Sequence, residues 1–207
     1  MLIRPRLDSL VVRSLPWPEV AVVLALATAP TLLVAVRHGR SPDDALLFWM
    51  VVAGAVFGFA FDEPARAVLD AVATPLARRT IARLAVLAVA IGVSGLAVVL
   101  VVRIDGGSLT PARAQAPALL AVIALSCAAA SVGRRRGADR VSLGEAAVGP
   151  MAVLVASGLA QRYPWLPTII DDRLAHRWLI PALAAFALAA WNTRDPYSPP
   201  SRSRSDL

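Results

Sequence analysis

The segment from Asp62 to Arg83 carries the side chains of this chain that are most able to take part in chemistry. It combines three carboxylates with four guanidinium groups and two prolines, and it separates two strongly apolar stretches. Charged groups of this kind form ion pairs and hydrogen bonds, which set the register of a contact between two molecules. The segment is therefore the first candidate for a binding function.

Apolar residues in the same segment recur at helical spacing, at Leu69, Val72, Ala73 and Leu76. They predict a short amphipathic helix that lies at a membrane face or against a protein. Pro75 disfavours helical geometry at Thr74, so we expect this helix to break or bend there. A solvated loop whose arginines only mark the cytoplasmic side is the alternative interpretation.

Catalytic and metal-binding patterns are not apparent in the sequence. The chain contains no lysine, and this excludes a Walker A loop, whose lysine must reach the phosphates of ATP. Its one cysteine, Cys127, cannot form an intrachain disulfide, and His38 and His176 are too isolated to indicate a metal site. The turn at 105–107 lacks the further carboxylates that a membrane phosphatidyl transferase uses. We expect no enzyme activity, no metal and no cofactor in this chain.

The composition indicates a membrane protein. Hydrophobic residues make up 57% of the chain and charged residues 17%, and the mean hydropathy is +0.65. Apolar runs close to the roughly 20 residues that a helix needs to cross hydrocarbon alternate with short charged clusters. The fold class that we predict is all-α, with six transmembrane helices at 19–36, 45–61, 84–102, 116–133, 144–160 and 179–191.

The arginines predict the orientation of these helices. Fourteen of the 21 basic residues fall on the side of the membrane that holds both termini, and seven fall on the other side. Both termini should therefore be cytoplasmic. Residues 1–15 form a predicted amphipathic interfacial segment, residues 16–193 the transmembrane domain, and residues 194–207 a flexible tail. Because the arginines flank membrane spans without interleaved aromatic residues, we expect contact with anionic lipids and no binding of nucleic acid.

The order of residues after the second run resembles the first cytoplasmic loop of type-2 ABC exporter permeases. Members of that family commonly show an acidic residue, a leucine-rich turn, and a Thr-Pro pair followed by basic residues. The matching positions here are Glu63, Leu69, Asp70, Thr74, Pro75, Leu76, Arg78 and Arg83. The sequence departs from the pattern at 64–65, where many members have a glycine-containing turn.

This resemblance implies a transport subunit of the plasma membrane that has no ATPase site of its own. A separate ABC ATPase subunit, which binds ATP and magnesium, would dock on a coupling helix between the second and third spans. Glu63, Arg66 and Asp70 would meet the ATPase, and Thr74 and Pro75 would set the angle of return to the membrane. The basic pair Arg78 and Arg79 would complete the coupling segment.

The resemblance also implies a second permease copy, as a homodimer or a related heterodimer. Gly54 and Gly58 form a small-xxx-small pattern that suits close helix packing, either between copies or within one subunit. Asp171 and Asp172 lie in the connection before the last span, where the family closes the outer end of its pathway. These two residues are candidates for an outer gate, and a solvated acidic loop is the alternative.

Apolar spans without deep ionisable residues favour a hydrophobic or amphipathic cargo over an ion. The resemblance implies that this cargo is exported across the plasma membrane. The alternative function is a non-transporting membrane scaffold or an immunity-type protein.

Overall fold

A computed structural model describes residues 14–36, 42–62, 76–104, 115–136, 141–160, 162–163, 165–167 and 175–193. This part of the chain is helical and contains no β-strand. Its elements are α2 (Trp17–Val36), α3 (Pro42–Gly54), η1 (Ala55–Phe61), α5 (Leu76–Ile104), α7 (Ala116–Arg135), α8 (Leu143–Ala160), η2 (Ala175–Trp178) and α9 (Leu179–Asn192).

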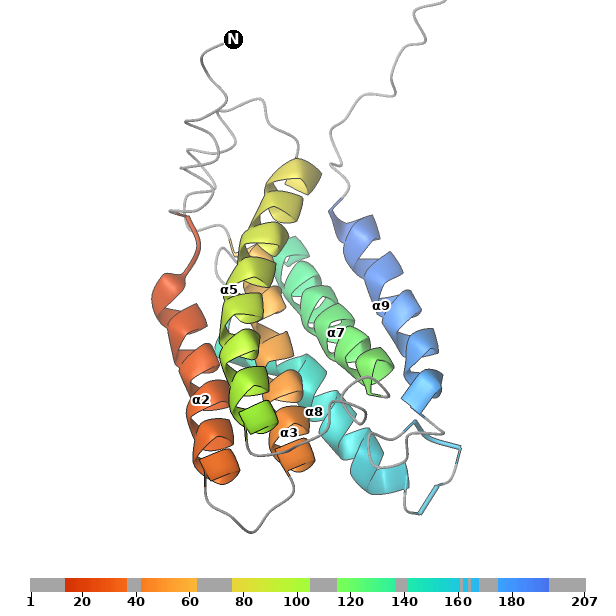
Figure 1. Cartoon of the computed structure of the whole chain (residues 1–207). Helices are drawn as coiled ribbons and strands as arrows, with labels where there is room; N and C mark the ends of the chain where they lie inside the picture. The colour runs from red at the N-terminus through yellow and green to blue at the C-terminus, as the bar shows by residue number, and fades with distance from the viewer. Residues whose placement is uncertain are drawn as a thin grey trace, which may run out of the picture.

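The helices alternate in direction along one bundle (Figure 1). The start of α2, the end of η1, the start of α5 and the end of α9 therefore lie at the same end of the molecule, which is at the top of Figure 1. The end of α7 and the start of α8 lie there too. We call this the entry end, because the first described residues lie there.

Three helices are long and apolar enough to cross a membrane: Arg78–Val101, Ala116–Arg135 and Leu143–Ala160. Two shorter apolar helices, Trp17–Leu33 and Phe48–Phe61, accompany them. Large apolar side chains on the outer face of α5 remain exposed, among them Val89, Val93 and Leu96. Exposed apolar surface of this extent marks a membrane or protein contact, so the helices indicate a membrane protein.

The third apolar run is part of a longer helix than its hydropathy predicts. We expected a span at 84–102, but α5 begins at Leu76 and has 29 residues. At 1.5 Å per residue its length is roughly 43 Å, against about 30 Å for the hydrocarbon core of a bilayer. Its first two turns can therefore extend beyond the hydrocarbon core. These turns contain arginines, which have a high helix propensity. The other predicted runs agree with the observed helices to within three residues at each end.

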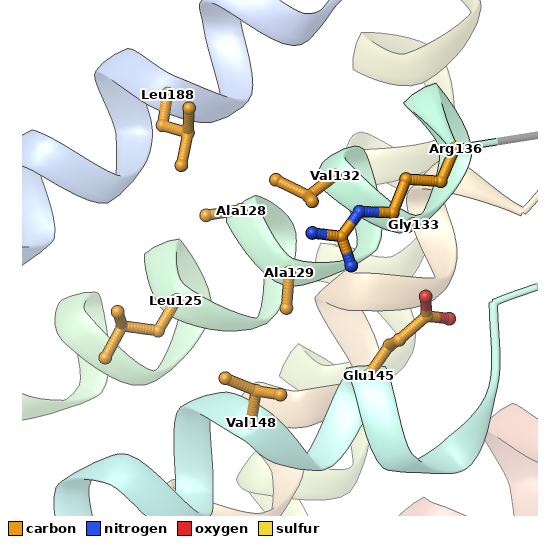
Figure 2. A pocket seen from close by; sticks show the side chains of 9 residues that line it. All are labelled: Leu125, Ala128, Ala129, Val132, Gly133, Arg136, Glu145, Val148 and Leu188. Carbon is orange, nitrogen blue, oxygen red and sulfur yellow. The ribbon is translucent and has the colours of Figure 1, made fainter.

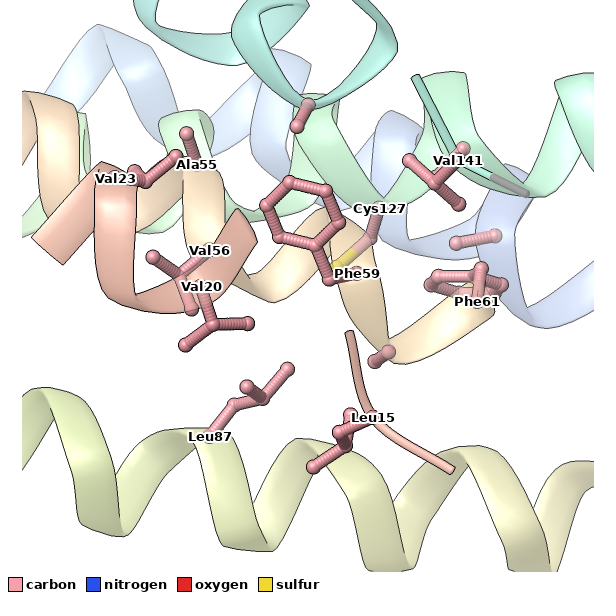
Figure 3. Packing of buried hydrophobic residues seen from close by; sticks show 14 residues of the cluster. Leu15, Val20, Val23, Ala55, Val56, Phe59, Phe61, Leu87, Cys127 and Val141 are labelled. Atoms are coloured by element: carbon pink, nitrogen blue, oxygen red, sulfur yellow. The ribbon is translucent and has the colours of Figure 1, made fainter. Parts of the chain in front are cut away.

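The central element of the bundle is α3 continued by η1. At Gly54 the helix tightens from α to 3₁₀ geometry, and nearly every residue of η1 is buried. It packs against α2, α5, α7 and α8, and Figure 3 shows Val56 and Phe59 within the core formed there. A 3₁₀ stretch that continues a helix often marks a hinge.

Both glycines of the small-xxx-small pattern face helices of the same chain. A methyl group at Gly54 would lie 2.7 Å from Val122 Cγ1 of α7, and one at Gly58 would lie 3.3 Å from the Cα of Ala146 in α8. These positions therefore allow close packing inside one subunit.

Helices α7 and α8 pack closely against each other at Gly149 and Pro150 of α8. Gly149 has no side chain, and the Val122 carbonyl and the Ser126 hydroxyl of α7 occupy the space that a methyl group would need. Pro150 has no N–H, so it cannot donate to the carbonyl of Ala146 four residues earlier. The Ser126 hydroxyl donates to that carbonyl instead, at 2.9 Å. Ser126 thus supplies the hydrogen bond that the Ala146 carbonyl does not receive from Pro150 within the helix.

Helix α9 packs on α7 through small residues, with Ala182, Ala185 and Ala189 buried. At the entry end, Asn192 Nδ2 donates to the Ser131 hydroxyl of α7 at 2.9 Å. Small side chains let the two backbones approach, and the polar contact fixes their register.

Candidate functional site: a buried arginine beside segment 63–75

The predicted coupling residues are divided between described and undescribed parts of the chain. Glu63, Arg66, Asp70, Thr74 and Pro75 lie outside the described residues, as do the gate candidates Asp171 and Asp172. Arg78 and Arg79 lie in the first turn of α5. The structure therefore defines the two ends of segment 63–75, which are Asp62 after η1 and the beginning of α5.

Arg83 is completely buried at these two ends. Its Nη1 donates to the backbone carbonyl of Asp62, and its Nη2 donates to the Ser14 hydroxyl at 2.9 Å. Asp62 ends η1, Ser14 precedes α2, and Arg83 belongs to α5. One guanidinium group thus joins three parts of the chain at the entry end. An arginine suits this position because its donors form a rigid fork that reaches two acceptors at once.

Arg78 and Arg79 have different environments although they are neighbours in sequence. Arg78 is exposed, whereas Arg79 is only 6% exposed. Residues four apart share a helix face, so Arg79 lies on the same side of α5 as Arg83. Burial of a guanidinium is costly unless it is compensated by polar contacts. Arg78 is therefore the basic residue of this turn whose side chain is accessible from outside.

A hollow of about 510 Å³ lies at the entry end between α7, α8 and α9. Figure 2 shows its walls, which are mainly apolar and include Leu125, Val132 and Leu188. The charged groups of Arg136 and Glu145 line one end of it. Its volume falls in the range of pockets that hold drug-sized molecules.

Glu145 also has a structural role at the start of α8. Its carboxylate accepts from the backbone N–H of Ser142 at 2.8 Å, and the Ser142 hydroxyl accepts from the N–H of Glu145 at 3.2 Å. This reciprocal pair is a capping box, which satisfies two donors at the helix start. The carboxylate packs directly over Gly133 of α7, where any side chain would collide with it. The capping box thus also joins α8 to α7.

Among the residues that the structure describes, no group of three histidine, cysteine or acidic side chains could hold a metal ion. Comparison with known proteins found no matching family model and no significantly similar curated protein or solved structure. The function therefore has to be argued from the residues and their arrangement.

Proposed function

We propose that this chain is the membrane subunit of a type-2 ABC exporter, which moves a hydrophobic or amphipathic cargo with energy from a separate ATPase. The observation that carries the proposal is the position of Arg83. This buried side chain links Asp62, at one end of segment 63–75, to α5, at the other end, and it also links both to Ser14 before α2. Because both ends of segment 63–75 are fixed to the bundle, a force that a partner applies to the segment would move η1 and α5.

In the proposed mechanism the ATPase binds segment 63–75 when it closes around ATP and magnesium. Glu63, Arg66 and Asp70 contact it through ion pairs, and the exposed Arg78 extends the contact at the start of α5. Movement of the segment then tilts η1 and α5 together against the rest of the bundle, because Arg83 connects them. Rigid movement of packed helices about a hinge is a common form of such a transition, and the 3₁₀ geometry of η1 provides a place for it.

The proposal requires six membrane spans with both termini in the cytoplasm. The alternating directions of the helical segments support this arrangement, since the start of α2 and the end of α9 lie at the entry end (Figure 1). The buried arginines of α5 lie at that end too. In this arrangement the protein lies in the plasma membrane and pairs with a second permease copy. Gly54 and Gly58 are already packed inside one subunit, so the second copy would contact another face.

The hollow between α7, α8 and α9 supports the proposed cargo class. Its walls are mainly apolar, and Arg136 and Glu145 at one end of it provide charges of both signs (Figure 2). Such a site favours an amphipathic molecule, whose apolar part contacts the apolar walls while its polar part lies at the charged end.

The proposal predicts that the protein co-purifies with an ATPase through segment 63–75. The chain is co-expressed with candidate soluble P-loop ATPases from the same genome, those encoded nearest to it first, and the ATPase retained on the tagged permease is measured. Reversing two charges with Glu63→Arg and Asp70→Arg should reduce retention about tenfold or more, because juxtaposed like charges cost several kcal/mol.

A matched control reverses two charges in the predicted outer connection, with Asp171→Arg and Asp172→Arg. This control should retain the ATPase as the unmodified chain does. Full retention by the Glu63 and Asp70 double variant contradicts the coupling assignment. Absence of any neighbouring ATPase gene favours the scaffold function instead.

A further inference from the structure

A second, smaller hollow lies at the entry end between α5 and α9. It has a volume of about 220 Å³, and its walls include Phe61 of η1, Leu84 of α5 and Phe186 of α9. Cys127 of α7 also lines it, and Figure 3 shows this cysteine beside Phe59 in the core. The site is thus separate from the hollow on the other side of α9, which is formed with α7 and α8.

The hydroxyl of Thr80 is the polar group of this hollow that most needs explanation. Thr80 is 3% exposed, lines the hollow, and its Oγ1 has no hydrogen-bond partner. A helical threonine can donate to a carbonyl in the preceding turn, as Thr193 in the same hollow does to Ala190 at 2.8 Å. A buried hydroxyl without a partner is costly. Oγ1 itself is fully buried, so rotation about the Cα–Cβ bond must first bring the hydroxyl to the wall of the hollow. A ligand atom that then forms this hydrogen bond would remove the cost.

The volume limits what can enter. Pockets for drug-sized ligands usually measure about 300–1,000 Å³, whereas a dry cavity of about 150 Å³ accepts benzene. A space of about 220 Å³ therefore fits one ring or a short alkyl segment. The tail of a bilayer lipid is plain hydrocarbon, which would fill the space but leave the Thr80 hydroxyl without a partner.

We propose that the hollow between α5 and α9 binds the apolar part of a small amphiphile that carries a hydroxyl or carbonyl group, and that Thr80 hydrogen-bonds this group. The binding itself needs no ATPase; identification of the amphiphile as the exported cargo rests on the proposed function.

The position of the hollow would connect its occupant with the coupling segment. Phe61 immediately precedes Asp62, whose carbonyl accepts from Arg83. Thr80 and Leu84 immediately follow Arg79 and Arg83 along α5. An occupant therefore contacts both elements that Arg83 joins, on either side of segment 63–75.

Photolabelling of the full chain in lipid nanodiscs tests the proposal. The probes are hexanol and hexane that each carry a diazirine, and the labelled peptides are identified by mass spectrometry. The hexanol probe should label peptides that contain Phe61, Thr80 and Phe186. Thr80→Val should reduce this labelling about two- to tenfold, the effect of one hydrogen bond, and should leave labelling by the hexane probe unchanged. Thr28→Val is the matched control, because Thr28 on α2 has a buried hydroxyl without a partner but does not line the hollow.

A second pair of variants tests the space itself. Ala190→Phe places a ring at the wall of the hollow from an exposed position and should abolish labelling there. Ala187→Phe changes an exposed alanine of α9 that does not line the hollow, and it should have no effect. Equal labelling by both probes, or no response to Thr80→Val and Ala190→Phe, overturns the proposal. The assay contains no ATPase, so failure of ATPase capture would leave its result unchanged.

Discussion

Replacing Arg83 with methionine is expected to lower the free energy of unfolding by about 2–4 kcal/mol. The change removes donors to the carbonyl of Asp62, which is buried, and to the hydroxyl of Ser14, which is half-buried. Methionine fills much of the same space, so the loss comes mainly from the missing hydrogen bonds. Reversible unfolding by SDS in mixed micelles, followed by circular dichroism, measures the effect.

Two further variants identify the cause. Arg78→Met removes an exposed guanidinium from the same turn and should change the free energy of unfolding by less than about 0.5 kcal/mol. Arg83→Lys keeps the charge but loses the two-pronged geometry, so its stability should lie between those of the unmodified chain and Arg83→Met. If Arg83→Met is as stable as Arg78→Met, Arg83 does not hold the three chain segments together.

Gly149→Ala should destabilise the bundle by about 3 kcal/mol, although it adds only one methyl group. The methyl group would collide with the Val122 carbonyl, which is backbone and cannot rotate away. Overpacking of this kind costs about 1–3 kcal/mol. Separation of the helices would also break the bond from Ser126 to Ala146, whose loss costs about 1 kcal/mol. The same SDS titration measures the change.

Gly158→Ala is the control in the same helix, because a methyl group there meets nothing within 4 Å. Alanine favours a helix over glycine by about 1 kcal/mol, so this variant should gain stability. The two substitutions should therefore have opposite signs. A loss of similar size in both would show that helix α8 itself, and not its contact with α7, responds to the change.

The sequence predicts the helices better than it predicts their contacts. Apolar runs such as 116–133 and 144–160 locate α7 and α8 to within two residues because lipid-facing helices must be apolar. Hydropathy does not locate the start of α5 at Leu76, because it identifies only the part of a helix that is apolar enough to lie in the hydrocarbon core. The contacts of Gly149 and Pro150 with α7 depend on tertiary packing, so the sequence of α8 alone does not predict them.

In the described part of the candidate site, too, the sequence does not predict which side chains are buried or what they contact. The sequence predicts one role for the basic pair Arg78 and Arg79, yet the two side chains differ in burial. Arg83 was expected only as a basic approach to the membrane, and its contacts with Ser14 and Asp62 are distant in sequence. The spacing of Thr80, Arg83 and Leu87 along one helix face could have indicated burial. It could not have named the partners.

The central claim is that segment 63–75 receives an ATPase subunit, and site-directed cross-linking tests it most directly. In a Cys127→Ala background, a cysteine at Asp70 carries a photoactivatable maleimide, and cells that co-express the candidate ATPase subunit are irradiated. We predict a covalent adduct between the two subunits, and none from a cysteine at Ile104, the exposed last residue of α5, which lies at the other end of the bundle. No adduct from position 70, or an adduct from position 104 in its place, would contradict the account.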